Sequence, residues 1–344
     1  MTNDYLWDRT GPPDPDIVRL ERLLSHLRPA ADGPRVLMFP GRARHQSSRP
    51  SWPFIAAAAS LAAVVVAMAG VSLRTGRSSA SLDVTRLEGT ATIASRPVVD
   101  RLELRAGTWL ETNDQGRASI DIASVGRVEV DPDTRISLLS SRPGQHRLQL
   151  QRGTIHALIW APPGQFVVET PSSTAVDLGC AYTLTVDEEG VGHVRVTSGW
   201  VGFEWRGRES FIPAGAVCTT RVGLGPGTPH FADTATAFNE ALAVLDLPGG
   251  PAEARRVALD RVLADARPKD AMTLWHLVSR LAGPDRARVF DRLAELAPPP
   301  PGVTRAGVLA GHRIMLDDWW DTLGLGAANW WRVWKQQWRD SPGR

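Results

Sequence analysis

Cysteine and lysine are scarce in this sequence, and neither sign of charge is in surplus. Among 344 residues there are two cysteines and two lysines, and 39 basic side chains are balanced by 37 acidic ones, giving a net charge of +2. A protein that binds nucleic acid through its phosphates needs a dense lysine and arginine surface. The charge balance therefore excludes nucleic acid as an expected partner.

The sequence also lacks the short motifs that mark common active sites. Its eight histidines are scattered, and neither cysteine has a histidine at metal-ligand spacing. There is no Gly-x-Ser-x-Gly elbow, no phosphate-binding loop and no Gly-x-Gly-x-x-Gly segment that enters a helix. We therefore expect no enzyme, no metal and no cofactor. An envelope enzyme would need carboxylates or histidines that only folding brings into one cleft.

One run of residues is long and apolar enough to cross a membrane. No charged residue lies between Arg49 and Arg74, and residues 54–73 read FIAAAASLAAVVVAMAGVSL. A helix of these 20 residues would be about 30 Å long, which matches the hydrocarbon thickness of a bilayer. We predict a transmembrane helix at 53–74. A buried core helix is one alternative, and a cleaved signal peptide with an unusually long leader is another.

Arginines flank this predicted span unequally. Four lie close before it and two lie close after it, at positions 35, 42, 44 and 49 and at positions 74 and 77. Because the more positive flank stays in the cytoplasm, the N-terminus is predicted to be cytoplasmic. Residues 74–344 would then lie outside the cytoplasm, with the membrane as a partner of the single span.

Residues 1–52 are too few to bury a core alone, and they contain one helix with clear start and stop signals. Asp14 suits the N-cap, Pro15 the first helical position, and Pro29 ends the helix. The apolar stripe of this amphipathic helix consists of Ile17, Leu20, Leu24 and Leu27. We expect the stripe to bind a cytoplasmic partner. Packing within the segment, or on the membrane surface, are the alternatives.

In residues 81–222 apolar residues recur at every second position, a pattern that is typical of half-buried strands. Ala118, Ile120 and Ile122 alternate with polar residues, as do Val194 and Val196. Glycine, proline and asparagine separate such runs at intervals of about 8–12 residues, as in sandwiches and barrels. The pattern predicts a mainly β outer domain, an antiparallel β-sandwich with a jelly-roll-like order, followed by a C-terminal all-α region.

Within this β-domain the sequence resembles the FecR family of periplasmic signalling proteins. The resemblance covers residues 82–220 and rests on five segments in order: LRAGTWLETNDQGRASIDI (104–122), LQLQRGTI (148–155), VVETP (167–171), VDLGCAYTLTV (176–186) and VRVTSGWVGF (194–203). The preceding predicted span agrees with it independently.

The resemblance implies a membrane regulator similar to anti-sigma factors. Such a protein would lie in the bacterial inner membrane, with its N-terminus in the cytoplasm and residues 74–344 in the periplasm. A periplasmic FecR-like domain would relay an envelope signal through the span to a cytoplasmic sigma factor or other regulator. An anchored scaffold that binds a glycan or an envelope protein, without cytoplasmic output, is the alternative.

Both cysteines, Cys180 and Cys218, fall on the outer side of the predicted span. An even pair in an oxidising compartment favours a disulfide, and closing a loop of about 40 residues would contribute about 3–4 kcal/mol. We therefore predict a disulfide between them. Two buried free thiols, packed as small apolar side chains, are the alternative.

The period changes again after residue 233, to that of helices. Apolar residues at three- and four-residue spacing predict a helical bundle at 233–297, and a proline spacer opens the segment 298–344. The Trp-rich tail that follows places Trp330, Trp334 and Trp338 on one helix face. These residues could pack as core, lie on a membrane surface, or bind a glycan or protein partner.

Overall fold

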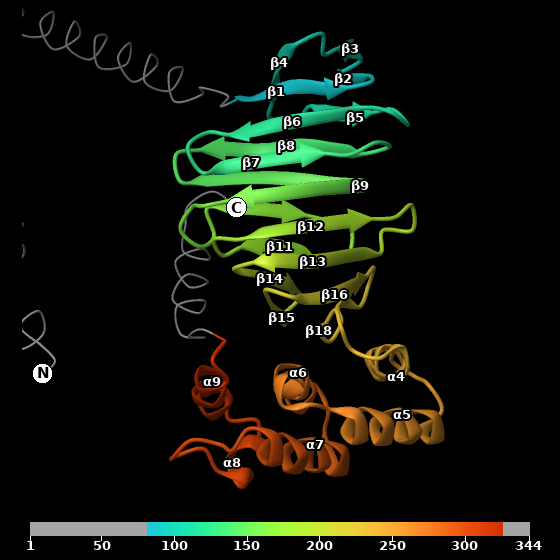
Figure 1. Cartoon of the computed structure of the whole chain (residues 1–344), viewed down its shortest axis with the longest axis vertical. Coiled ribbons are helices and arrows are strands. Elements are labelled where there is room, and N and C mark those ends of the chain that lie inside the picture. The colour runs from blue at the N-terminus through green and yellow to red at the C-terminus, as the bar shows by residue number, and fades with distance from the viewer. Residues whose placement is uncertain (1–80, 326–344) are drawn as a thin grey trace, which may run out of the picture. The chain divides into compact units, whose positions relative to one another are not determined.

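The computed structural model describes residues 81–325 (Figure 1). The chain divides into two compact units, Met1–Ser72 and Leu73–Arg344, and every described residue belongs to the second. From residue 81 to residue 325, no helix is both long and apolar enough to cross a membrane. Three predicted features lie outside the described residues: the span at 54–73, the stripe of Ile17, Leu20, Leu24 and Leu27, and the tail residues Trp330, Trp334 and Trp338.

Residues 81–231 form strands, as their alternating pattern predicts. Tyr182, Leu184 and Val186 are buried while Thr185 between them is exposed, because successive side chains of a strand point to opposite faces. The strands are β1 Ser81–Glu88, β2 Ala91–Ile93, β3 Arg96–Pro97, β4 Arg101–Arg105, β5 Trp109–Thr112, β6 Arg117–Ile122, β7 Gly126–Val130, β8 Arg135–Arg142, β9 Gln145–Ile159, β10 Phe166–Glu169, β11 Thr174–Asp177, β12 Ala181–Val186, β13 Gly192–Ser198, β14 Trp200–Trp205, β15 Arg208–Pro213, β16 Ala216–Arg221, β17 Gly225–Pro226 and β18 His230–Phe231.

These strands pair in two sheets that share β9. One sheet, called sheet A, has the order β4-β1-β6-β7-β9-β12-β13-β16, with β17 and β18 paired to β16. The other, sheet B, has the order β3-β2-β5-β8-β9-β10-β11-β14-β15. Neighbours in each sheet are close in sequence, so the predicted jelly-roll-like order, which needs two Greek keys, is wrong. All pairings are antiparallel except that of β9 with β10.

Strand β9 passes from one sheet to the other at Gly153. Its first half pairs with β8 and β10, and its second half pairs with β7 and β12. Gly153 has a φ of 94°, and a Cβ atom there would lie 2.2 Å from Thr134 Oγ1. The sequence pattern predicts a turn at Gly153 between two strands. The structure replaces that turn with a bend, because glycine alone combines this backbone conformation with such close contact.

Helices follow the strands, as predicted for 233–297. Four α-helices lie in that range, and two further α-helices follow within the described residues. The α-helices are α4 Thr236–Asp246, α5 Ala252–Asp265, α6 Ala271–Arg280, α7 Gly283–Leu296, α8 Arg305–Leu309 and α9 Arg313–Thr322. Of these, α6 contributes the most buried residues, and α9 buries Trp319 and Trp320.

An aromatic cluster joins the helices to strand β15. We call it the helix–strand junction and define it by Trp200, Phe211, Trp275, His276 and Trp320. The ring centroid of Trp320 lies 4.7 Å from that of Trp275 and 5.7 Å from that of Phe211. The Phe211 backbone N–H donates to His276 Nε2 at 3.0 Å. Helix α6 thereby satisfies an amide on β15, the last strand of sheet B, and covers an edge that would otherwise be open.

Candidate functional site

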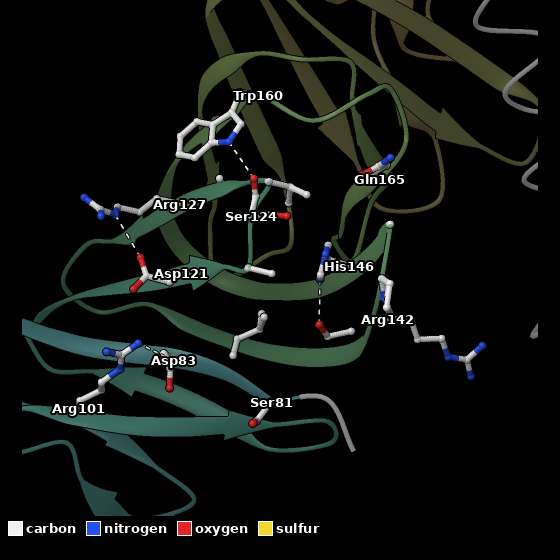
Figure 2. A pocket seen from close by; sticks show the side chains of 17 residues that line it. Ser81, Asp83, Arg101, Asp121, Ser124, Arg127, Arg142, His146, Trp160 and Gln165 are labelled. Carbon is white, nitrogen blue, oxygen red and sulfur yellow. Dashed lines mark hydrogen bonds and ion pairs between the residues drawn. The ribbon is translucent and has the colours of Figure 1, made fainter. Parts of the chain in front are cut away.

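A polar groove lies where β1 begins, beside the β6–β7 turn and the β8–β9 turn. We call it the Trp160 groove; its volume is about 770 Å³, within the range of roughly 300–1,000 Å³ that is usual for small-molecule sites. Figure 2 shows the ring of Trp160 at the top of the groove, the two ion pairs on the left below it, and His146 and Gln165 on the right. The groove combines side chains from five separate parts of the β region.

Trp160 is the large aromatic of this groove and follows directly after β9. The residue is 63% exposed, although its position is fixed by two hydrogen bonds. Its backbone N–H donates to the Val125 carbonyl and its indole Nε1–H donates to the Ser124 carbonyl, each at 2.9 Å. A rigid and exposed indole presents a flat apolar face to solvent at little further entropic cost.

Two exposed ion pairs line the groove on the sheet A side. Arg127 Nε lies 3.3 Å from Asp121 Oδ1, and Arg101 pairs with Asp83. In register, Asp83 on β1 lies opposite Asp121 on β6, so the two pairs are cross-strand neighbours. Because their side chains are 41–59% exposed, each keeps lone pairs and N–H groups available to a ligand.

His146 and Gln165 provide the neutral polar groups of the groove. Burial lowers the pKa of His146, so its imidazole is neutral near pH 7. Its Nδ1 lies 2.9 Å from Ser141 Oγ, and its backbone N–H donates to the Gln165 carbonyl. Within residues 81–325, neither His146 Nε2 nor the Gln165 side-chain amide has a hydrogen-bond partner. Both groups lie in the lining of the groove.

A row of side chains on sheet A has the composition of a hydrolase triad. His156 Nε2 lies 2.7 Å from Asp131 Oδ2, and His156 Nδ1 lies 3.0 Å from Thr183 Oγ1. Thr183, however, sits in the middle of β12 and pairs on one side with His156 and on the other with Arg195. Its neighbouring backbone amides are used by the sheet, so none can stabilise an oxyanion. The row is a cross-strand hydrogen-bond ladder.

The two cysteines are free thiols, which corrects the predicted disulfide. Cys218 on β16 is in register with Val194 on β13, which pairs with Leu184 on β12. Cys180 precedes Leu184 by four residues. The two Cα atoms are therefore separated by two strand spacings and about four residue rises, roughly 16 Å, whereas a disulfide needs at most about 6.8 Å.

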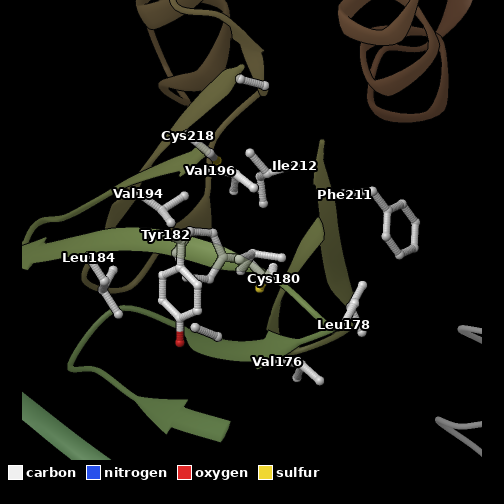
Figure 3. Packing of buried hydrophobic residues seen from close by; sticks show 14 of the residues in the cluster. Val176, Leu178, Cys180, Tyr182, Leu184, Val194, Val196, Phe211, Ile212 and Cys218 are labelled. Carbon is white, nitrogen blue, oxygen red and sulfur yellow. The ribbon is translucent and has the colours of Figure 1, made fainter. Parts of the chain in front are cut away.

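Both cysteines lie in the buried hydrophobic cluster of Figure 3, and each thiol has its own hydrogen-bond partner. Cys180 Sγ donates to the carboxylate of Asp177, and Cys218 Sγ donates to the Gly227 carbonyl at 3.3 Å. Burial raises the pKa of both thiols, so both stay protonated and unreactive. Burial also raises the pKa of Asp177 to about 7, against the opposing hydrogen bonds from Cys180 and Gly179.

The helix–strand junction carries a second charged cluster, which is buried. Asp246 Oδ1 on α4 lies 3.1 Å from Arg208 and 3.7 Å from Arg280, and it accepts from Thr228. Arg280 also donates to the Glu209 carbonyl and to Ser210 Oγ. These contacts fasten α4 and α6 to β15, because each buried polar group of the cluster finds its partner on another element.

Sequence reasoning alone misses the residues of the groove. Trp160, His146 and the two ion pairs come from segments up to about 80 residues apart, and no local spacing connects them. One signal was available: Trp160 follows Ile159, so an outward-facing aromatic ends a strand just before Pro162 and Pro163. Among residues 81–325 there is no group of three or more histidine, cysteine, aspartate or glutamate side chains placed to hold a metal.

Comparison with known proteins gives a match to a family model and a distant structural likeness. The family model described as FecR protein matches residues 108–202, and a search of curated proteins finds no match. Two crystal structures described as "a putative anti-sigma factor from Parabacteroides distasonis ATCC 8503" are similar to 45% of this chain at 13% identity and a TM-score of 0.32. They are covered over 74% and 73% of their own lengths.

The matched residues run from just before β5 into β14 and include all of β9. They contain much of the Trp160 groove, from Asp121 to Gln165. The resemblance read from the five sequence segments is thereby confirmed. Residues 108–202 are therefore similar to the FecR protein family.

Proposed function

We propose that this chain is a single-pass regulator of the bacterial inner membrane that is similar to anti-sigma factors. Its FecR domain would receive an envelope signal in the periplasm, and residues 1–52 would pass it to a cytoplasmic sigma factor or other regulator. The observation that carries this proposal is the FecR match at 108–202. The charge-free run at 54–73 that precedes it supplies the membrane crossing.

The groove offers a physical route from a bound ligand to the span. Ser81, Leu82 and Asp83 begin β1 and line the groove. Only the six residues 75–80 separate them from the predicted span at 53–74, and six residues reach at most about 22 Å. A ligand that contacts the first residues of β1 therefore acts on the point where the chain enters the FecR domain. Binding there transmits a signal only if it favours one of two arrangements of that connection.

The test is affinity capture of the full chain from native membranes, compared with a chain lacking residues 1–52. A sharper pair of variants probes the cytoplasmic stripe: Leu20→Gln with Leu24→Gln changes two of its residues, and Arg22→Gln changes the opposite helix face. We expect a sigma factor or other regulator to be captured by the full chain and by the Arg22 variant. It should be lost from the double variant and from the truncated chain.

An anchored envelope-binding module without cytoplasmic output is the second candidate. The observation that favours it is the rigid, exposed Trp160 in a polar groove, which suits binding whether or not a signal follows. The same experiment separates the two functions. Identical catches from the full and truncated chains, made up of envelope components, would contradict the regulator and leave the anchored module.

A further inference from the structure

The Trp160 groove offers one large apolar surface, the indole ring. The backbone N–H and the indole N–H of Trp160 both donate hydrogen bonds to carbonyl groups of the β6–β7 turn. The ring is therefore held in place although the residue is 63% exposed. In Figure 2 the ring stands at the top of the groove, and the two ion pairs lie below it on the same side of the view. A ligand with one flat, weakly polar face would remove this ring from water.

The remaining lining mixes small apolar residues such as Ala123 and Pro143 with five charged side chains, three arginines and two aspartates. Asp83 with Arg101 and Asp121 with Arg127 form two neutral pairs, each of which offers acceptors and donors side by side. A strongly anionic ligand would meet the two carboxylates, and a cation would meet the two guanidinium groups. The third arginine, Arg142, extends away from both pairs in Figure 2. A neutral ligand rich in hydroxyl groups can bond to both members of each pair.

Two neutral groups add to the hydrogen-bond donors and acceptors of the groove. His146 Nε2 and the Gln165 amide have no partner within residues 81–325, and burial keeps the imidazole neutral near pH 7. The volume of about 770 Å³ lies toward the upper end of the usual range for small-molecule sites, so the groove has room for a ligand of several linked rings. Its occupant is therefore an extended molecule with a flat face and many hydroxyl groups.

We propose that the Trp160 groove binds a neutral oligosaccharide, with one sugar ring stacked on Trp160 and its hydroxyl groups bonded to the Asp121–Arg127 and Asp83–Arg101 pairs. This inference rests on the proposed function and names the class of envelope ligand that the FecR domain receives. It also places ligand contacts on β1, the strand that continues toward the predicted span.

The experiment is titration calorimetry on the full chain in detergent, with maltotriose, the trimer of N-acetylglucosamine and an acidic glutamate hexapeptide as probes. We expect at least one trisaccharide to bind and the peptide not to bind. Trp160→Ala should weaken saccharide binding about tenfold or more, and Asp121→Asn should weaken it by a similar factor. Leu158→Ala is the matched control, because Leu158 is 55% exposed on the same strand and does not line the groove.

Equal melting temperatures of the variants establish that loss of binding is not loss of folding. Trp160→Phe gives a second check, since it keeps an aromatic face and should retain part of the affinity. Binding of neither trisaccharide, saccharide binding unchanged in Trp160→Ala, or binding of the hexapeptide alone would each overturn the proposal. Capture of a cytoplasmic partner through residues 1–52 is a separate measurement, so the failure of either proposal is recognised without the other.

Discussion

The Trp160 groove and the helix–strand junction are built from the same residue types, placed differently with respect to water. In the groove, Arg101 and Asp83 are 59% and 46% exposed, and the tryptophan stands in solvent. At the junction, Arg280 and Asp246 are 12% and 11% exposed. Trp320 there is 2% exposed. The groove keeps its polar groups accessible to solvent, whereas those of the junction form contacts within the protein.

This difference separates residues that stabilise the fold from residues free to serve binding. An exposed ion pair contributes about 0–1 kcal/mol to stability, so the groove gains little from holding its charges together. A buried pair that loses one member leaves a charge without compensation, which costs several kcal/mol. Variants should therefore divide into two classes: those at the junction reduce stability, and those in the groove reduce binding.

The largest expected effect compares the two tryptophans. Trp320→Ala removes a buried ring that contacts Trp275, Phe211 and Trp200, and it should lower the free energy of unfolding by about 3–5 kcal/mol. Trp160→Ala removes an exposed ring and should change it by less than about 1 kcal/mol. Thermal unfolding of the two variants measures this difference. Equal losses of stability in the two variants would contradict the distinction between a stabilising junction and a groove free to bind.

The arginines provide the next comparison. Arg280→Leu leaves Asp246 with Arg208 and Thr228 as partners and also removes hydrogen bonds to Glu209 and Ser210. The expected loss is about 3 kcal/mol, the lower end of the range for a broken buried pair. Arg101→Leu breaks an exposed pair and should cost about 0–1 kcal/mol. Urea unfolding at low and high salt checks this, since only the effect of the exposed pair should shrink with salt.

The strands and the helices could be predicted from local patterns. A period of two identifies each half-buried strand, as for Tyr182, Leu184 and Val186, because burial on one face is a local property. The four helices at 233–297 follow from apolar spacing and from breaks such as Pro248 to Gly250. The FecR resemblance added the order of the segments and the expectation of a periplasmic domain.

The bend in β9, the state of the cysteines and the groove could not be predicted in this way. A glycine inside an alternating run marks either a turn or a bend, and only Thr134, packed against Gly153 from the connection before β8, distinguishes them. The distance between Cys180 and Cys218 depends on the register of three strands. The groove depends on which strand ends meet, and that is a property of the whole topology.

Two buried titratable groups extend the comparison to pH. At the junction, burial lowers the pKa of His276 to about 3, so stability is lost as pH falls from about 6.5 toward 3. In the β region, burial raises the pKa of Asp177 to about 7, so stability is lost as pH rises from about 4 to 7. Between about pH 4 and 6.5 the two groups therefore change the free energy of unfolding in opposite directions, each by up to about 1.4 kcal/mol per pH unit.

Single variants should reveal each slope. In His276→Gln, whose amide oxygen can still accept from Phe211, the melting temperature should fall as pH rises from 4.5 to 6.5, relative to the wild type. In Asp177→Asn it should rise over the same interval. Melting curves at several pH values test both signs. Profiles that both follow the wild type would contradict the assignment of these two groups.

The smallest expected effect is on the thiols, and it tests whether the junction can open by itself. A reducing agent should leave the melting temperature unchanged, because there is no disulfide to break. A drop of several degrees would show instead that the two cysteines form a disulfide.

Alkylation of both thiols should be slow in the native protein. Cys218 bonds to the Gly227 carbonyl, which Ser210 of β15 also contacts, whereas Cys180 bonds to Asp177 inside the β region. Trp320→Ala should therefore speed alkylation of Cys218 and leave Cys180 protected, because local opening exposes only the residues of the loosened region. Equal acceleration at both thiols would mean that the strands and the helices unfold together and that the junction is no separate unit of stability.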